Sequence, residues 1–186
     1  MYLIFEGIDK SGKTTLAKYV AELLSCRYVK RPRNLLPIEN KDVDMIQQYN
    51  LVIDLFKDEK FVVLDRFYPS EIVYSYLRGK DKLKDIKDQI WDIDFSIAPN
   101  AIIFILETDK EQVCSRLKEL GEDIIKEEDV SKIMERYSEF EKSSNARPVM
   151  IDKYCSFREK VHIVLDRILN LRLPQDLKAD DFISEN

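Results

Sequence analysis

The sequence predicts an α/β protein built on a five-stranded parallel sheet with helices on both faces. Two observations lead to this prediction. Short apolar runs alternate with amphipathic segments along the chain, as expected when helices connect the strands of a parallel sheet. A glycine-containing loop also separates the first apolar run from the first amphipathic segment. That position is typical of a loop that binds phosphate groups.

The expected strands are short and mostly apolar, as buried parallel strands require; they lie at 2–6, 27–30, 61–65, 101–106 and 148–152. Apolar residues recur at helical spacing between them, which predicts helices at 14–24, 43–56, 69 to 76 or 77, 80–91, 110–120, 130–140 and 156–171. Right-handed crossovers place the carboxyl ends of parallel strands along one edge of the sheet. The glycine loop, Asp65-Arg66 and the residue after Leu106 are therefore expected to share one crevice.

Composition limits the classes of function. The 186 residues carry a net charge of −5, which argues against broad binding of nucleic acid or anionic membranes. No apolar run approaches the ~20 residues of a membrane span, and the N-terminus lacks signal-peptide features. The three cysteines lie far apart, which favours reduced thiols and a cytoplasmic protein. We expect one domain over 1–173 with a short lid at about 116–128, and a polar, mobile tail over 174–186.

The glycine loop is a complete phosphate-binding loop, or P-loop. Residues 7–14 read G-I-D-K-S-G-K-T and match the pattern G-x-x-x-x-G-K-T between a strand and a helix. Backbone N–H groups of such a loop point at phosphate oxygens. The Lys13 ammonium reaches the β- and γ-phosphates, and the Thr14 hydroxyl ligates Mg²⁺. The sequence therefore predicts a site for a nucleoside triphosphate.

Three further charged residues belong to the predicted crevice. Asp65 ends an apolar strand, where a second carboxylate would lie near the metal; alternatively it caps the following turn. Arg66 beside it brings a planar, permanently charged donor to the transferred phosphoryl group. Asp9 lies inside the P-loop and would repel a triphosphate, so we expect it to point toward a second substrate or the metal.

Two segments resemble thymidylate kinases. Residues 5–15, F-E-G-I-D-K-S-G-K-T-T, are similar to the P-loop of that family, and residues 65–75, D-R-F-Y-P-S-E-I-V-Y-S, to its signature D-R-Y-x-x-S-x-x-A-Y. The resemblance extends from residue 2 to about 168. It includes Leu106-Glu107, Arg116 and Gly121-Glu122-Asp123 on the route into the lid, and Arg136-Tyr137 after the lid.

This resemblance implies a three-layer P-loop kinase fold with a short lid. It also implies transfer of the γ-phosphoryl group of ATP to a deoxynucleoside monophosphate, thymidylate first of all, with Mg²⁺ and in a homodimer. The residues implied in catalysis are Lys13, Asp9, Asp65 and Arg66, to which Lys10 is added below, and those implied at the metal are Thr14 and Asp65.

The same resemblance divides the remaining site residues between donor and acceptor. ATP is implied to contact the P-loop, and Arg116 to lie near the adenine: Gly7, Ile8, Asp9, Lys10, Ser11, Gly12, Lys13, Thr14, Thr15 and Arg116. The acceptor is implied to contact five side chains, with Arg33 near its phosphate: Asp9, Arg33, Arg66, Ser70 and Tyr74.

The chain departs from the family at two places. The family places an arginine in the lid or in the P-loop, whereas here the lid holds Ile124 and Ile125 and the P-loop holds Lys10. We assign Lys10 the charge-stabilising role; the alternative is a solvated loop lysine. The family also reads thymine with an arginine on the helix before the D-R strand, but residues 34–64 contain no arginine. The amides available there are Gln47, Gln48 and Asn50.

Two alternatives follow from these departures. In the first, the chain keeps kinase chemistry but phosphorylates a nucleoside or a modified pyrimidine. In the second, it is a P-loop protein that binds nucleotide and acts as a regulatory partner. The arginines at 31 and 33 suit an acceptor phosphate and argue against a free nucleoside, while the intact Lys13, Thr14, Asp65 and Arg66 argue against a purely regulatory role.

Overall fold

The computed structural model describes residues 1–30, 45–78, 87–120 and 126–172. Its centre is a five-stranded sheet in the order β2-β3-β1-β4-β5, in which every neighbouring pair is parallel. The strands are β1 (Tyr2–Glu6), β2 (Arg27–Lys30), β3 (Val62–Asp65), β4 (Ala101–Leu106) and β5 (Val149–Ile151). The predicted parallel sheet is confirmed, with each strand within one residue of its expected bounds.

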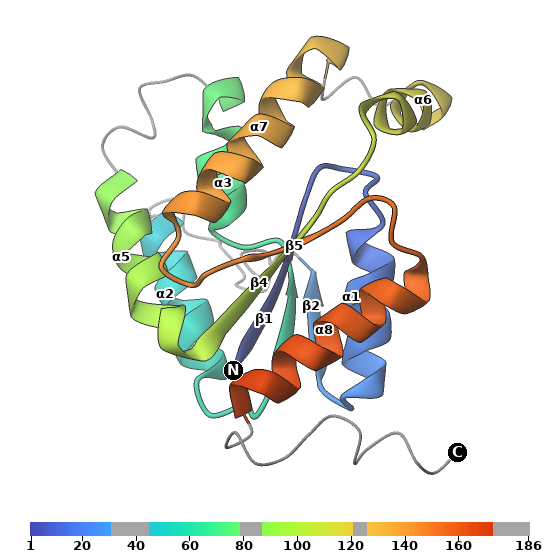
Figure 1. The fold of residues 1–186 in the computed structure, drawn as a ribbon. Coiled ribbons are helices and arrows are strands. Elements are labelled where there is room, and N and C mark those ends of the chain that lie inside the picture. The colour runs from blue at the N-terminus through green and yellow to red at the C-terminus, as the bar shows by residue number, and fades with distance from the viewer. Residues whose placement is uncertain (31–44, 79–86, 121–125, 173–186) are drawn as a thin grey trace.

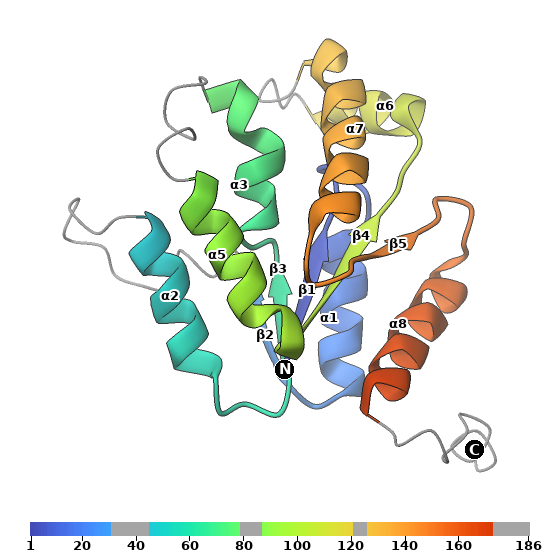
Figure 2. The same cartoon turned by 60° about the vertical axis from the view of Figure 1, so that its left-hand side comes forward.

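Helices cover both faces of the sheet, as expected. Figures 1 and 2 show α1 (Lys13–Leu23) and α8 (Phe157–Arg172) on one face. The other face carries α2 (Met45–Phe56), α3 (Pro69–Tyr74), α5 (Lys87–Ile97) and α7 (Glu127–Ser143). Helix α6 (Lys110–Leu120) lies beyond the strand ends, and two 3₁₀ turns, η2 (Ser75–Arg78) and η3 (Ala98–Asn100), follow α3 and α5.

The alternation of side chains along β1 produces two separate cores. Leu3 and Phe5 pack with α1 and α8, while Tyr2 and Ile4 pack with the helices of the opposite face. Successive residues of a strand point to opposite faces. All five residues of β1 are buried, so this central strand is apolar throughout until its last residue, Glu6.

Two helices differ from the sequence-based expectation. A helix was expected over 80–91, but 80–86 lie outside the described residues and α5 continues to Ile97, because Ile90, Ile93 and Ile97 form a buried stripe. Helix α7 begins at Glu127 rather than at 130, since three acidic residues in its first turn interact favourably with the positive end of the helix dipole.

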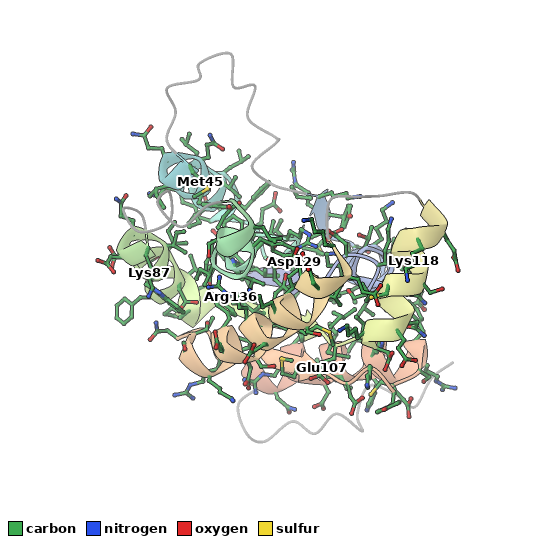
Figure 3. The ribbon with its side chains drawn as sticks, turned by 90° about the horizontal axis from the view of Figure 1, so that it is seen from above. Met45, Lys87, Glu107, Lys118, Asp129 and Arg136 are labelled. Carbon is green, nitrogen blue, oxygen red and sulfur yellow. The ribbon has the colours of Figure 1, made fainter. Side chains whose placement is uncertain are left out.

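The carboxyl ends of the strands meet at one edge, seen from above in Figure 3. Phe5 pairs with Asp65 and Glu6 with Ile105, so the P-loop, the D-R segment and the residue after β4 share this edge as predicted. The lid expected at about 116–128 includes 121–125, which lie outside the described residues, as does the tail over 174–186; both stay predictions. Among the helices described, none is long and apolar enough to cross a membrane.

Candidate active site

The P-loop follows β1 and leads directly into α1. Gly7 and Gly12 both have positive φ, 137° and 88°, in the region that favours glycine. A Cβ at Gly7 would lie only 2.7 Å from the carbonyl oxygen of Leu106, so the close approach of the loop to β4 also requires glycine. Lys13 opens α1 with its side chain buried, and the amides of the first turn point toward the loop, where anions bind.

Arg66 lies at the centre of the site and donates hydrogen bonds in several directions. Its Nη2 is 2.6 Å from Asp9 Oδ1 and 3.2 Å from the Tyr74 hydroxyl, and its Nη1 is 2.9 Å from Ser70 Oγ and 3.3 Å from the Tyr137 hydroxyl. Arg66 has a φ of 70°, an unfavourable conformation for a side chain of this size. The surrounding hydrogen bonds hold it there.

Glu6 is a buried acceptor for this cluster, and sequence reasoning missed it. Its carboxylate accepts hydrogen bonds from the Phe67 amide (2.8 Å), the Ser70 hydroxyl (2.8 Å) and the Tyr137 hydroxyl (2.9 Å), and Arg66 Nη1 lies 3.8 Å away. Burial raises the pKa of Glu6, although Arg66 and these donors act in the opposite direction. The signal in the sequence is a single acid at the end of an apolar strand.

The Asp9 carboxylate of the P-loop interacts with two positive charges, those of Lys13 and Arg66. Lys13 Nζ lies 3.5 Å from the same Asp9 oxygen that Arg66 contacts. Burial alone would raise the pKa of Asp9, but Arg66 and Lys13 hold it below its ordinary value. Burial, reinforced by Arg66, lowers the pKa of Lys13. Asp9 thus contacts both Arg66 and Lys13, and its role beside a second substrate stays a prediction.

Thr14 and Asp65 fit a magnesium ion held largely by nucleotide phosphates. Thr14 Oγ1 donates to Asp65 Oδ2 at 2.6 Å, so the predicted metal ligands are adjacent. No cluster of three or more acidic, histidine or cysteine side chains able to hold a metal occurs in the part of the chain that the structure describes. Mg²⁺ commonly takes one or two protein oxygens together with phosphates and water, and this donor set suits that mode.

Tyr28 is a second residue that sequence reasoning missed. It lies on β2 and donates from its hydroxyl to Asp65 Oδ2 at 2.9 Å. Burial and the hydrogen bond to Asp65 raise the pKa of Tyr28, so its proton stays in place. Tyr28 and Thr14 therefore fix the orientation of one carboxylate from two sides. Tyr28 lies close to Asp65 because the edge strand β2 pairs with β3, the strand that ends at Asp65.

The other predicted residues occupy varied positions. Arg116 on α6 is exposed and donates to the Lys10 carbonyl oxygen at 2.6 Å, which brings α6 over the P-loop. Lys10 has a φ of 68°. Ile8 is buried among the helices of the α7 face, and Thr15 is exposed on α1. Ser11 is buried, and Arg33 lies outside the described residues.

Helix α7 is hydrogen-bonded to the end of α3 through Arg136. The Arg136 guanidinium donates to the carbonyl oxygen of Ile72 at 3.0 Å and to Ser75 Oγ at 2.8 Å, and so satisfies groups at the end of α3. The next residue, Tyr137, donates to Glu6 and to the Gly7 carbonyl oxygen at 3.2 Å. Two consecutive residues of α7 therefore support α3 and the P-loop.

Comparison with known proteins agrees with this geometry. No protein-family model matches the chain. The probable thymidylate kinase of Methanocaldococcus jannaschii is 29% identical, over 87% of this chain and 92% of that protein, and a thymidylate kinase of Ehrlichia ruminantium is 27% identical over 81% and 87%. The chain is a homologue of the thymidylate kinases. The resemblance predicted from the P-loop and the D-R segment is confirmed.

Solved structures share the fold at lower identity. The YorR protein of Bacillus subtilis, crystallised in complex with phosphorylated GDP, has a TM-score of 0.69 at 21% identity and covers 94% of this chain and 100% of its own. The thymidylate kinase of Ehrlichia chaffeensis has a TM-score of 0.55 at 23% identity, over 91% and 98%. The three-layer fold expected from the thymidylate kinase resemblance is therefore present.

Proposed function

We propose that the protein transfers the γ-phosphoryl group of ATP to a deoxynucleoside monophosphate, with thymidylate as the acceptor that the names of its relatives support. The observation that carries this proposal is the shared Asp9 carboxylate, which lies 2.6 Å from Arg66 and 3.5 Å from Lys13. Asp9 thereby connects Lys13, which is proposed to bind the phosphates of ATP, with Arg66, which lies among the residues proposed to bind the acceptor. A phosphoryl group that moves from ATP to an acceptor nucleotide must pass between two such sets of residues.

The donor half consists of the P-loop and the start of α1. Backbone amides and Lys13 bind the ATP phosphates, and Arg116 lies near the adenine; its hydrogen bond to the Lys10 carbonyl oxygen, which holds it beside the loop, supports this role. Thr14 and Asp65 would hold Mg²⁺, which supplies charge neutralisation at the phosphates when bound. Lys10 would add a positive charge near the transferred group.

The acceptor half consists of Asp9, Arg66, Ser70 and Tyr74, with Arg33 proposed at the acceptor phosphate. An oxygen of that phosphate attacks the γ-phosphorus in line, and the bond to the bridging oxygen of ADP breaks. No covalent enzyme intermediate is required, because positioning and charge stabilisation supply the catalysis. Arg66 is suited to the transferred phosphoryl group, since its fork presents several donors at once.

A coupled assay of ADP release with ATP, Mg²⁺ and thymidylate tests the proposal. We expect turnover in the wild type and a loss of at least about a hundredfold in Lys13→Ala, with Lys57→Ala, an exposed lysine of the same charge, unchanged. Phosphorylation of thymidine without its phosphate would instead indicate a nucleoside kinase. Binding of ATP without turnover of any acceptor would indicate the regulatory alternative.

We also propose a homodimer and a cytoplasmic location. The exposed apolar residues Leu51 and Leu55 on α2 support a contact surface on that helix. Measurement of the solution mass by light scattering tests this, and Leu55→Glu is expected to shift a dimer toward monomer. A monomeric mass for the wild type at micromolar concentration would contradict the dimer.

A further inference from the structure

A pocket of about 180 Å³ lies beside the end of β4, on the face of the sheet that α7 covers, and the proposed phosphoryl transfer does not use it. Its lining comes from the P-loop, β4, α7 and β5 and is mostly apolar: Ile8, Ile105, Leu106, Met134, Tyr137 and Met150. An apolar cavity of about 150 Å³ is large enough to hold a benzene ring. This pocket therefore has the size of one ring with a short substituent.

Thr108 supplies a buried polar group inside the pocket. It is 4% exposed, it belongs to the lining, and its hydroxyl forms no hydrogen bond with the residues that the structure describes. A buried hydroxyl without a partner costs free energy. The hydroxyl of Ser138, by contrast, donates to the Met134 carbonyl oxygen of its own helix at 3.4 Å. The Thr108 hydroxyl is therefore available to a ligand.

Two carboxylates lie at the mouth of the pocket. Glu107 directly follows β4 and Glu135 lies on α7, and both are exposed although they belong to the lining. Figure 3 marks Glu107 at this edge of the molecule. Within the described part of the chain, neither carboxylate forms an ion pair. Two such carboxylates attract a cation and repel anions, so the nucleotides of the proposed reaction do not suit this pocket.

We infer that the pocket is a second ligand site, which binds a small ammonium compound with one ring and thereby acts on the P-loop. The ring contacts the apolar walls, where the two methionines adapt to its shape. The ammonium group donates charge-assisted hydrogen bonds to Glu107 and Glu135 at the mouth. Apolar walls with a few polar groups are the usual composition of a small-molecule site.

The action on the P-loop follows from two residues that line the pocket. Ile8 belongs to the loop, and Tyr137 donates from its hydroxyl to the Gly7 carbonyl oxygen at 3.2 Å. A ligand packed against both side chains holds Tyr137 in this position and favours the described conformation of the loop. We therefore expect the occupied pocket to tighten the binding of ADP by about fivefold.

Methionine-methyl NMR with benzylamine as the probe tests the site. The chain has four methionines, of which Met134 and Met150 line the pocket and Met1 and Met45 do not. We expect benzylamine to shift the methyl signals of Met134 and Met150 in a saturable way, with a Kd of about 1 mM, and to leave the other two unchanged. Benzyl alcohol has the same number of heavy atoms but no charge, and it should bind about fivefold more weakly.

Two variants with matched controls on α7 assign the contacts. Glu135→Gln should weaken benzylamine binding by about threefold or more and leave benzyl alcohol unaffected, whereas Glu139→Gln, an exposed glutamate outside the pocket, should change neither. Ser138→Phe should fill the pocket and abolish the binding of both probes. Ser143→Phe, an exposed serine that also donates to a carbonyl oxygen of its own helix, should abolish neither. Because Glu135 is exposed, its variant tests the site even if Ser138→Phe misfolds.

Calorimetric titration of ADP with and without 10 mM benzylamine, about ten times the expected Kd, tests the action on the P-loop. We expect the tightening in the wild type and none in Ser138→Phe. The measurement needs no turnover, so its result does not depend on the proposed function. The inference is overturned by equal or non-saturable shifts of all four methyl signals, by benzylamine binding that folded Ser138→Phe retains or folded Glu135→Gln leaves unchanged, or by an ADP affinity that benzylamine does not alter.

Discussion

The guanidinium of Arg66 and the carboxylate of Asp9 form an ion pair of 2.6 Å across 57 positions of sequence. The pair joins the end of β3 to the P-loop, and Lys13 shares the same carboxylate oxygen. Asp9 therefore neutralises part of the positive charge that phosphates meet when they bind. Residues of the proposed donor and acceptor halves are thus in direct contact in the structure.

Replacing Arg66 by lysine keeps the charge but removes the fork. A lysine ammonium has three N–H donors on one nitrogen, so it cannot replace the four hydrogen bonds that the two terminal nitrogens of Arg66 donate. We therefore expect kcat/KM to fall by about a hundredfold or more. Arg27→Lys, a surface change beside Glu59, is the matched control and should retain activity. Steady-state kinetics with ATP and thymidylate measure both. An Arg66→Lys enzyme within a few fold of wild type would show that the fork is dispensable.

The raised pKa of Glu6 predicts where activity is lost in acid. The pKa of Glu6 lies above its ordinary value of 4.5, whereas the pKa of Asp9 lies below its ordinary value of 3.8. A protonated Glu6 no longer offers a negative charge to Arg66, so kcat/KM is expected to fall as the pH drops through a midpoint above 4.5. A raised carboxyl pKa means that ionised Glu6 lowers stability, and protonation relieves this cost. Activity should therefore decline before stability does.

Two measurements check this prediction. The pH dependence of kcat/KM gives the midpoint in the wild type, and thermal unfolding over the same range gives the stability. Glu6→Gln resembles the protonated form, so its activity should be low and nearly independent of pH across that midpoint. A wild-type midpoint at or below 4.5 would assign the acid limb to another group.

Removing the Tyr28 hydroxyl should weaken metal binding. Tyr28→Phe keeps the ring but frees one side of Asp65, and loss of such a supporting hydrogen bond lowers metal affinity by about tenfold. We expect the half-saturating Mg²⁺ concentration to rise by that factor, and Mn²⁺ binding in the presence of a non-hydrolysable ATP analogue, followed by electron paramagnetic resonance, to weaken in parallel. Tyr19→Phe, a half-exposed tyrosine on α1, is the control. Unchanged Mn²⁺ affinity would limit Tyr28 to a packing role.

The two P-loop glycines should respond differently to alanine. At Gly7 the new Cβ meets the Leu106 carbonyl oxygen at 2.7 Å, whereas at Gly12 no atom lies within 4 Å. Both positions have positive φ and carry a strain of about 1–2 kcal/mol, but only Gly7→Ala adds a backbone clash. We expect Gly7→Ala to lower Tm by several degrees more than Gly12→Ala, as measured by calorimetry. Equal losses would show that β4 shifts to accommodate the methyl group.

Local pattern was enough to predict the strands and the P-loop, because apolar runs and glycine spacing are encoded over a few residues. The roles of Glu6, Tyr28 and Tyr137 could not be predicted in this way. Each depends on contacts between distant segments, such as the 131 positions between Tyr137 and Glu6, and none carries a local motif. The end of helix α5 was placed too early for a similar reason. Asp94 has the character of a surface residue, but it is buried because the hydroxyls of Tyr68 and Ser144 donate to its carboxylate.

Arg136 and Tyr137 are neighbours on one rigid helix, yet one holds the end of α3 and the other holds Glu6 and the P-loop. A rotation of α7 would break both sets of hydrogen bonds in the same movement. We therefore expect these two segments to open cooperatively, and the amides of α3 and of the P-loop to exchange with solvent as one unit.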